Sequence, residues 1–447
     1  MVARGRGDLK NAAPAAGNEA GFVAEVITVG NELLSGRTVD TNFTYLARVL
    51  EAAGARVLRH ESVEDQPEAI AAEIKSALSR AALVVVTGGL GPTPDDVTRK
   101  GVALALGRPL SLDPDVLEDL RGRWKARGGR DPMPPNNELQ AMVPRGATIV
   151  PNPVGSAPGL QIQTEGSAVF VLPGVPSEME AMARETVVPW VRSRAGRAVS
   201  YFTARTHGIW ESVLAERLGD LASALPGYAV AYLPGGGGVD VRVRLPQGDP
   251  ASVDELRERA RRVLRERIGA HVFGEDDETL ESAVGKWLLT RGYQVAVAES
   301  CTGGLLAGRI TEVSGSSAYF DRGVVCYSNA AKVALAGVPA SLIEEHGAVS
   351  EAVARALARG IAQACGAQVG IGVTGIAGPT GGTPEKPVGT VHIACFAPEG
   401  EWHRLLQLTG SRHSIRERSV AAALDLTRRL LAGLPQPGAD AVKPGRS

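Results

Sequence analysis

The sequence predicts two α/β domains, the first of them built on a parallel, doubly wound sheet, with a smaller α+β domain between them. Three observations lead to this prediction. The chain has 447 residues, which is too long for a single hydrophobic core. Short apolar runs alternate with amphipathic helical patterns at both ends of the chain, and the middle lacks this alternation. We expect domains at 21–192, 198–272 and 278–433, with disordered ends at 1–20 and 434–447.

The first domain alternates strands with helices. Helices are expected near 41–53 and over 67–80, where the apolar residues of the second pattern fall on one face. The run 83–86 is entirely apolar, as in a strand buried on both faces, and it ends in Thr87-Gly88-Gly89. The strands expected here are 22–29, 56–63 and 83–86.

The middle segment has a different pattern. A helix is expected over 211–225, ending at Pro226, and a second one over 253–268. Two strands, 228–232 and 239–245, flank the glycine run 235–238. This composition favours a compact α+β domain.

The last segment again alternates strands with helices, as expected for an α/β domain. The expected helices are 280–291, 329–337, 350–365 and 412–431, with one more after Ser300. The expected strands are 294–298, 323–327 and 368–373, followed by a hairpin of 389–396 with 402–408.

The bulk composition excludes several classes of protein. With 48 Lys and Arg against 49 Asp and Glu, the net charge of -1 gives no general attraction to nucleic acid or to an anionic membrane. The four cysteines form no CxxC pair and no zinc-site spacing, which is typical of reduced cytosolic thiols. The N-terminal stretch lacks the apolar segment of a signal peptide, and no apolar run is long enough to span a bilayer. We therefore expect a cytoplasmic protein that does not bind membranes and for which nucleic acid is the less favoured partner.

A candidate catalytic turn follows the strand at 294–298. It contains Glu299, Ser300, Cys301 and Thr302 and leads into a helix. In an open α/β sheet, ligands bind at the carboxyl ends of strands, and free N–H groups at a helix N-terminus can hold an anion. A serine at such a turn could attack a carbonyl while nearby N–H groups hold the oxyanion. The alternative is that Ser300 or Thr302 only caps the helix.

Two further polar turns follow apolar strands in the same segment, at 327–332 and 373–390, so the three turns together predict one pocket. The strings AESCTGG (298–304), YSNAAK (327–332), VTGIAGP (373–379) and GTPEKPVGTV (382–391) resemble the nicotinamide-nucleotide amidohydrolase domain of the CinA/PncC family. The resemblance covers essentially all of 278–433.

This resemblance implies hydrolysis of nicotinamide mononucleotide to nicotinic acid mononucleotide and ammonia. It makes Ser300 the nucleophile and Lys332 its base, with Tyr327 close by, and it requires no cofactor at this site. A lysine can act as a base only when burial lowers its pKa, and the alternative is a solvated lysine on a helix. Cys301 is the rival nucleophile, although no histidine lies in these motifs and a buried structural cysteine is the simpler interpretation.

The substrate-binding residues implied by the same resemblance come from three motifs. Both arginines of the family's last motif, Arg412 and Arg416, are present as phosphate ligands, and the alternative for Arg416 is a solvated helix face. Ser411 replaces the family's usual Asp, which leaves the orientation of Arg412 open. The full predicted set is Thr302, Gly303, Gly304, Thr374, Gly375, Arg412 and Arg416.

A second candidate site follows the strand at 83–86. The glycines of Thr87-Gly88-Gly89-Leu90-Gly91 would let backbone N–H groups approach a phosphate, and the carboxylates of Asp95 and Asp96 could bind a hard cation. The alternative is that Asp95 or Asp96 caps the next helix.

This neighbourhood resembles the molybdopterin-binding (MoaB/MogA-like) domain found at the N-terminus of CinA. The resemblance rests on Gly30–Gly36, Asp40-Thr41-Asn42, the TGGLGPTPDD string and Pro173–Met179. It implies metal-dependent hydrolysis of ADP-ribose to AMP and ribose 5-phosphate, and a homodimer. A divalent ion of the Mg or Co type would be held by Asp40, Asp95 and Asp96, while Glu32 could be a ligand or a structural residue. Thr87, Gly88, Gly89 and Gly91 would bind the substrate.

The middle segment resembles the KH-like domain that links the two halves of CinA. Its glycine run follows Pro234 without adjacent Lys or Arg, which favours a plain inter-strand turn over a nucleic-acid grip. In Thr206–Ser212 the sequence departs from the family pattern, and we assign His207 no chemical role. Three hypotheses therefore remain: a bifunctional nucleotide hydrolase, a non-enzymatic protein of competence or DNA repair that binds nucleotides or DNA, and an enzyme with one active half.

Overall fold

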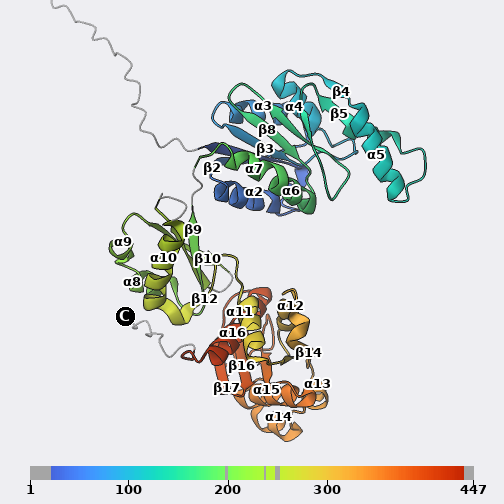
Figure 1. The fold of residues 1–447 in the computed structure, drawn as a ribbon. Helices are drawn as coiled ribbons and strands as arrows, with labels where there is room; N and C mark the ends of the chain where they lie inside the picture. The colour runs from blue at the N-terminus through green and yellow to red at the C-terminus, as the bar shows by residue number, and fades with distance from the viewer. Residues whose placement is uncertain (1–21, 197–199, 236–237, 247–251, 437–447) are drawn as a thin grey trace, which may run out of the picture. The chain divides into compact units, whose positions relative to one another are not determined.

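A computed structural model describes residues 22–196, 200–235, 238–246 and 252–436 of the chain (Figure 1). The chain divides into two compact units, one up to Val199 and the other from Ser200 onward. The predicted disordered end 1–20 and most of the predicted tail 434–447 lie outside the described residues. No described helix combines the length and the apolar character that a bilayer crossing requires.

The first unit is built on a six-stranded sheet in the order β2-β1-β3-β8-β7-β6. The strands β2, β1, β3 and β8 are parallel, but β7 is antiparallel to β8 and β6 to β7. The predicted wholly parallel sheet is therefore wrong at this edge. Only a tight turn at Thr164–Ser167 joins β7 to β8, and a connection this short cannot join parallel strands. The strands are β1 (Val23–Val29), β2 (Arg56–Val63), β3 (Leu83–Thr87), β6 (Thr148–Val150), β7 (Gly159–Gln163) and β8 (Ala168–Leu172).

Helices cover both faces of this sheet (Figure 1). Alternate residues of β1, β3 and β8 point to opposite faces, so one set packs against α2, α6 and α7 and the other against α3 and α4. The carboxyl ends of β1 and β3 are left open for loops. The helices are α1 (Asn31–Leu34), α2 (Thr41–Ala52), α3 (Pro67–Leu78), α4 (Thr98–Leu106), α5 (Pro114–Ala126), α6 (Pro176–Met182) and α7 (Val188–Arg192); β4 (Leu110–Leu112) and β5 (Met142–Pro144) form a separate pair.

The second unit begins with the middle domain, an antiparallel sheet in the order β10-β11-β9-β12. The sequence analysis missed its strands β9 and β12, and the single helix expected at 211–225 is two helices. Residues 218–220 separate them. In the glycine run, Gly235 pairs with Gly238, and residues 236–237 lie outside the described residues. The elements are β9 (Tyr201–Thr206), α8 (Glu211–Arg217), α9 (Leu221–Ala224), β10 (Ala229–Gly235), β11 (Gly238–Arg244), α10 (Val253–Ile268) and β12 (Val272–Glu275).

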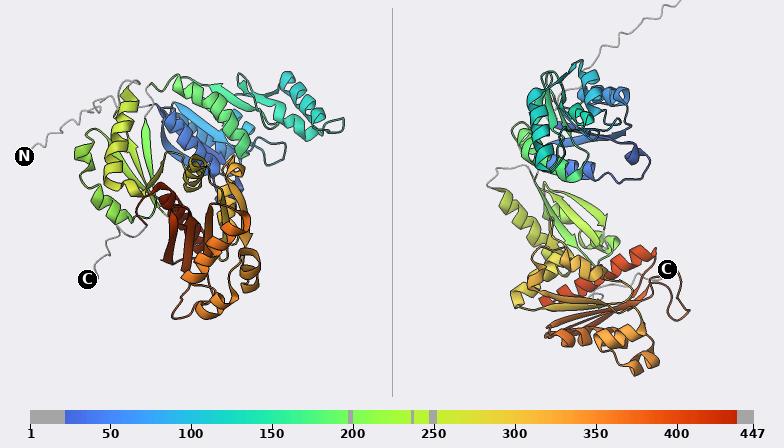
Figure 2. Two further views of the ribbon diagram at one scale, coloured as in Figure 1. Left: turned by 60° about the horizontal axis from the view of Figure 1, so that its bottom comes forward. Right: turned by 90° about the vertical axis from the view of Figure 1, so that its right-hand side faces the viewer.

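The C-terminal domain has a five-stranded sheet in the order β14-β13-β15-β16-β17. Its first three strands are parallel, and β16 and β17 form the predicted antiparallel hairpin. Helices α11, α12 and α16 pack on one face and α13, α14 and α15 on the other (Figure 2). The strands are β13 (Val295–Glu299), β14 (Phe320–Val325), β15 (Val369–Gly375), β16 (Thr390–Ala397) and β17 (Gly400–Gln407). The helices are α11 (Leu280–Arg291), α12 (Leu305–Thr311), α13 (Asn329–Ala336), α14 (Ala340–His346), α15 (Glu351–Cys365) and α16 (Arg412–Ala432).

A buried ionic cluster joins the middle domain to α16. The carboxylate of Asp425, which is fully buried, accepts hydrogen bonds from Arg428 at 2.7 Å and Arg429 at 2.9 Å. Arg428 also donates to the carbonyl of Ala270, and Arg429 lies 3.1 Å from the ring of His271. Because a buried carboxylate is costly unless it is paired and hydrogen-bonded, this cluster fixes the contact between the two domains of the second unit.

Candidate active site

The predicted nucleophile and its base are in contact. Ser300 directly follows β13, and Lys332 lies one turn into α13, which Ser328 caps by accepting a hydrogen bond from Ala331 N. The Nζ atom of Lys332 is 3.2 Å from the Oγ atom of Ser300, and both side chains are buried. This distance allows a proton to pass between the hydroxyl and the amine.

The surroundings of the Lys332 amine favour its neutral form. Its other two neighbours are the carbonyl oxygens of Cys326 at 2.9 Å and Tyr327 at 3.2 Å. No carboxylate of the described residues forms an ion pair with it. Burial lowers the pKa of Lys332, since the charged form loses more hydration than the neutral one. A neutral amine can donate to the two carbonyls and still accept the proton of Ser300.

Cys301 is not arranged as a nucleophile. Its side chain is 5% exposed and packs in the core between the sheet and α16. Burial raises the pKa of its thiol to about 12, so the thiolate is scarce near neutral pH. The structural interpretation of this cysteine therefore agrees with its surroundings.

Glu299 is a site residue that the sequence analysis did not identify. Its carboxylate is buried and accepts hydrogen bonds from the backbone N–H groups of Gly304, Leu306 and Ala307 at 2.8–3.0 Å. These are the free N–H groups at the start of α12 that were expected to hold an anion of the substrate. That expectation is wrong for these three groups, because Glu299 already occupies them. A carboxylate just before the turn Ser300–Gly304 is the signal that could have revealed this cap.

Thr302 and Arg416 lie beside the nucleophile. The guanidinium of Arg416 donates to the carbonyl oxygen of Thr302 through Nη2 at 2.7 Å and Nε at 3.3 Å. It lies against Gly303, where a Cβ atom would come within 3.3 Å of Nη2. The hydroxyl of Thr302 is buried without a hydrogen-bond partner among the described residues. The turn therefore buries one unsatisfied hydroxyl and holds one guanidinium against Gly303, within three residues of Ser300. Gly303 and Gly304 both have positive φ, which suits glycine.

Tyr327 and Arg412 are linked to the same site, because the carbonyl oxygen of Tyr327 accepts a hydrogen bond from Lys332. Arg412 donates to the carbonyl oxygen of Gly378 at 2.7 Å and to the Tyr327 hydroxyl at 3.1 Å. Ser411, which replaces the family's Asp, accepts a hydrogen bond from Ser414 N and so still caps α16. The side chain of Tyr327 is 60% exposed. The orientation of Arg412 that the sequence left open is thus set by two oxygen acceptors.

The contribution of Thr374 and Gly375 is structural in this arrangement. The hydroxyl of Thr374 donates to the carbonyl of Ala348 at 2.7 Å, and a Cβ atom at Gly375 would lie 2.8 Å from Thr390 O. Ser300 N donates to Val373 O, so a backbone hydrogen bond from the turn to β15 fixes the position of Ser300. These two residues hold the strand end that supports Ser300.

In the first unit, the predicted motifs meet in one hollow at the carboxyl ends of β1 and β3. Its lining includes Glu32, Asp40, Thr87 and Gly88. Asn42 donates to the Thr87 hydroxyl at 3.1 Å and to Gly174 O at 2.8 Å, which ties three motifs together. Gly88 cannot carry a side chain, because a Cβ atom would lie 2.2 Å from Val29 O.

The three predicted metal ligands are not brought together. Asp40 caps α2 by accepting from Phe43 N, and its second oxygen lies 3.1 Å from His60 Nε2. Asp96 accepts both the N–H and the hydroxyl of Thr93, and Asp95 is exposed. Neither Asp95 nor Asp96 is among the residues that line the hollow, and the described residues contain no group of three or more His, Cys, Asp or Glu able to hold a metal. The carboxylates as placed do not fit a divalent ion.

Gly89 and Gly91 allow close packing of the loop beside this hollow, and Asp65 holds the start of α1. A Cβ atom at Gly89 would lie 2.3 Å from Thr98 Oγ1, and one at Gly91 would lie 2.4 Å from Asp96 Oδ2, so both glycines allow the loop to pack closely. Asp65, which the sequence analysis missed, accepts from Asn31 N at 2.9 Å. Burial raises the pKa of Asp65, and the charges of Glu32, Asp95 and Asp96 raise it further.

Comparisons with known proteins cover most of the chain. Residues 277–431 match the family model "CinA C-terminal domain", residues 25–193 match "Probable molybdopterin binding domain", and residues 203–274 match "Damage-inducible protein CinA KH domain". A CinA-like protein of Gemmatimonas aurantiaca is 45% identical over 94% of this chain and 98% of its own length. One of Frankia casuarinae is 42% identical over 92% of this chain and 97% of its own length.

Among solved structures, the protein CinA of Thermoplasma acidophilum, whose function its description gives as unknown, is 40% identical. It covers 38% of this chain and 98% of its own length, with a TM-score of 0.35. The three successive family matches and the two full-length relatives agree with the domain order of the structure. The chain therefore belongs to the CinA family, with a molybdopterin-binding-type domain, a KH domain and a CinA C-terminal domain in that order.

Proposed function

We propose that the C-terminal domain hydrolyses the carboxamide of nicotinamide mononucleotide, giving nicotinic acid mononucleotide and ammonia. The observation that carries the proposal is the 3.2 Å contact between Ser300 Oγ and a buried Lys332 amine that has no acidic partner. The family to which the chain belongs supports the choice of substrate. The two arginines at the rim supply the charge that a phosphate requires.

In this proposal the reaction has two halves. Ser300 Oγ forms a bond to the carboxamide carbon while its proton passes to Lys332 Nζ. The tetrahedral intermediate then loses ammonia, which takes the proton back from Lys332, and leaves an ester on Ser300. Water attacks this ester with Lys332 again accepting the proton. The bond to Ser300 breaks, the serine recovers its proton, and the nicotinate product leaves.

The remaining site residues would bind and position the substrate. Arg416 and Arg412 would hold the phosphate, because a planar guanidinium pairs well with its oxygens. Tyr327 would act through its neighbours, since its carbonyl contacts Lys332 and its hydroxyl contacts Arg412. The unsatisfied hydroxyl of Thr302 is a candidate donor to the substrate.

The nucleophile and base are tested by substitution. Ser300→Ala and Lys332→Met should each lower kcat for ammonia release by at least about 10³-fold, since each removes a group that takes part in bond making or proton transfer. Cys301→Ser is the matched control and should stay within about threefold of wild type, as it leaves the proposed serine–lysine pair intact. Loss of activity in Cys301→Ser together with retention in Ser300→Ala would contradict the proposal.

The pH dependence follows from the lowered pKa of Lys332. The base must be neutral to accept a proton, so kcat/KM should rise with pH as Lys332 loses its proton. Because burial lowers this pKa, the midpoint of the rise should lie below 10.5, the ordinary value for lysine. The measurement is ammonia release from nicotinamide mononucleotide across the pH range. Activity that falls as pH rises toward 9 would contradict the assignment of Lys332 as the base.

The phosphate assignment is tested by comparing two substrates. Arg416→Met should raise KM for nicotinamide mononucleotide by about 10-fold or more while changing kcat less, because a charge-assisted contact to the phosphate is lost. The wild-type preference over nicotinamide riboside, which lacks the phosphate, should shrink by a similar factor. Arg322→Met, which alters an exposed arginine on β14, is the control. An unchanged preference in Arg416→Met would remove this arginine from the phosphate site.

A second candidate activity, hydrolysis of ADP-ribose to AMP and ribose 5-phosphate, concerns the first unit. The hollow that unites Thr87, Gly88 and Asn42 favours it, as does the match to a molybdopterin-binding-type domain. We assign no step to a metal, since the carboxylates as placed do not form a ligand set. The homodimer that the family resemblance implies belongs to the same proposal.

This activity is tested by AMP release from ADP-ribose with and without added Mg²⁺ or Co²⁺. We expect release that depends on the hollow, so Asn42→Ala should lower it about 10-fold or more by freeing the contacts to Thr87 and Gly174. Asn137→Ala, which alters an asparagine elsewhere in the same unit, is the control. No release of AMP under any of these conditions would reject the second activity and leave the amidase proposal untouched.

A further inference from the structure

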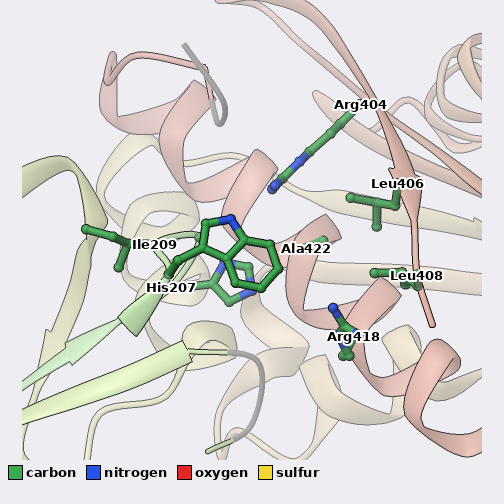
Figure 3. Close-up of a pocket in the computed structure, with 9 residues that line it drawn as sticks. His207, Ile209, Arg404, Leu406, Leu408, Arg418 and Ala422 are labelled. Carbon is green, nitrogen blue, oxygen red and sulfur yellow. The ribbon is translucent and has the colours of Figure 1, made fainter. Parts of the chain in front are cut away.

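A pocket of about 160 Å³ lies between the middle domain and the C-terminal domain, inside the second unit (Figure 3). The middle domain contributes Ile209 and Trp210, from the motif that departs from the family pattern. The C-terminal domain contributes residues of β17 and α16, including Arg404 and Arg418. Pockets that enclose a whole drug-sized ligand hold about 300–1,000 Å³, so this one would enclose part of a small ligand and leave the rest in contact with solvent.

The pocket is separate from the serine–lysine site. Arg416 and Arg418 are two residues apart on α16, which places them about 200° apart around the helix axis. Arg416 contacts the nucleophile turn, whereas Arg418 lines the pocket together with Ala422, one turn further on. None of the residues that line the pocket belongs to the site around Ser300.

Arg404 points into the pocket, and one nitrogen of its guanidinium is unsatisfied. It lies on β17, and Leu406, two residues on, lines the pocket from the same face of the strand. Figure 3 shows its side chain extending from the strand toward the middle of the cavity. Its Nη1 atom is buried and has no hydrogen-bond partner among the described residues. A buried donor of this kind is costly unless a ligand or water satisfies it.

The pocket carries positive charge without a carboxylate in its lining. Asp425, a buried acidic group on α16, is already paired with Arg428 and Arg429. Arg418 has one contact, to the carbonyl of Thr409 at 3.1 Å. The guanidinium groups of Arg404 and Arg418 are therefore both available to an anion.

The opposite wall is apolar and aromatic. Trp210 lines the pocket, yet its side chain is 69% exposed, which is unusual for so large an apolar group. An indole face in this position can stack on a planar ring, and base–aromatic stacking is worth about 1–3 kcal/mol. Ile209 and Leu406 supply apolar contacts beside it.

We propose that this pocket binds a mononucleotide, with its phosphate on Arg404 and Arg418 and its base on Trp210. A partly enclosed pocket with two cations and one exposed indole matches one phosphate and one ring. Single-stranded nucleic acid is the less favoured ligand, because the chain's net charge is -1 and an extended basic groove would be needed to follow a strand.

The test is isothermal titration of the full chain with AMP, adenosine, inorganic phosphate and the oligonucleotide dT8. Wild type should bind AMP more tightly than either adenosine or phosphate. Arg404→Leu should weaken AMP binding at one site by about 10-fold or more, through loss of a charge-assisted contact. Trp210→Ala should weaken AMP binding by about 5-fold or more and leave phosphate binding unchanged. The control Arg322→Leu, on the exposed strand β14, should match wild type.

Folding of each variant is checked by circular dichroism, and Arg418→Gln provides a second charge variant if Arg404→Leu unfolds. AMP binding that is absent from wild type, or equal in wild type, Trp210→Ala and the charge variant, would overturn the proposal. Tighter binding of dT8 than of AMP, with the same dependence on Arg404, would replace the mononucleotide by nucleic acid. Because Ser300 takes no part in these measurements, their outcome is independent of the amidase assays.

Discussion

The burial of one amine governs the chemistry available to the C-terminal domain. Lys332 is 2% exposed, and its neighbours are a hydroxyl and two carbonyl oxygens rather than a carboxylate. An acidic partner at this position would stabilise the ammonium and remove its ability to accept a proton. The fold instead surrounds the amine with uncharged oxygen atoms. The cap at Ser328 starts α13 so that the lysine, one turn later, reaches back toward the carbonyls that precede the helix.

The charges around the nucleophile are divided between two elements. Glu299 satisfies the start of α12, so that helix end is no longer a place for a phosphate. Positive charge comes instead from α16. Its Arg412 is held by the carbonyl oxygen of Gly378, and its Arg416 by the carbonyl oxygen of Thr302. The same helix faces the middle domain through Asp425. One helix thus supplies the rim of the candidate active site and one wall of the candidate nucleotide pocket.

Much of this arrangement could be predicted from sequence because it follows from local patterns. The apolar runs predicted β1, β2 and β3 of the first sheet and β13, β14 and β15 of the C-terminal sheet, and the hairpin of β16 and β17 is as expected. The strands β6, β7 and β8 of the first sheet were missed. The contact between Ser300 and Lys332, 32 residues apart, came from the family resemblance, since no spacing rule joins two such loops. The antiparallel edge of the first sheet depends on one short turn, and the capping role of Glu299 depends on where the next helix begins. Asp40 and Asp96 looked like ligands because carboxylates that cap a helix or hold a loop have the same sequence pattern as carboxylates that bind a metal.

The most direct measurement is the protonation of Lys332 itself. The full chain, labelled with ¹³C at the lysine Cε position, can be titrated by NMR, with Lys332→Arg used to assign the resonance. The account predicts that this lysine loses its proton at a pH below 10.5, the ordinary value for a lysine. A pKa for Lys332 at or above the ordinary value would mean that the amine is charged beside Ser300, and the proposed base would be lost.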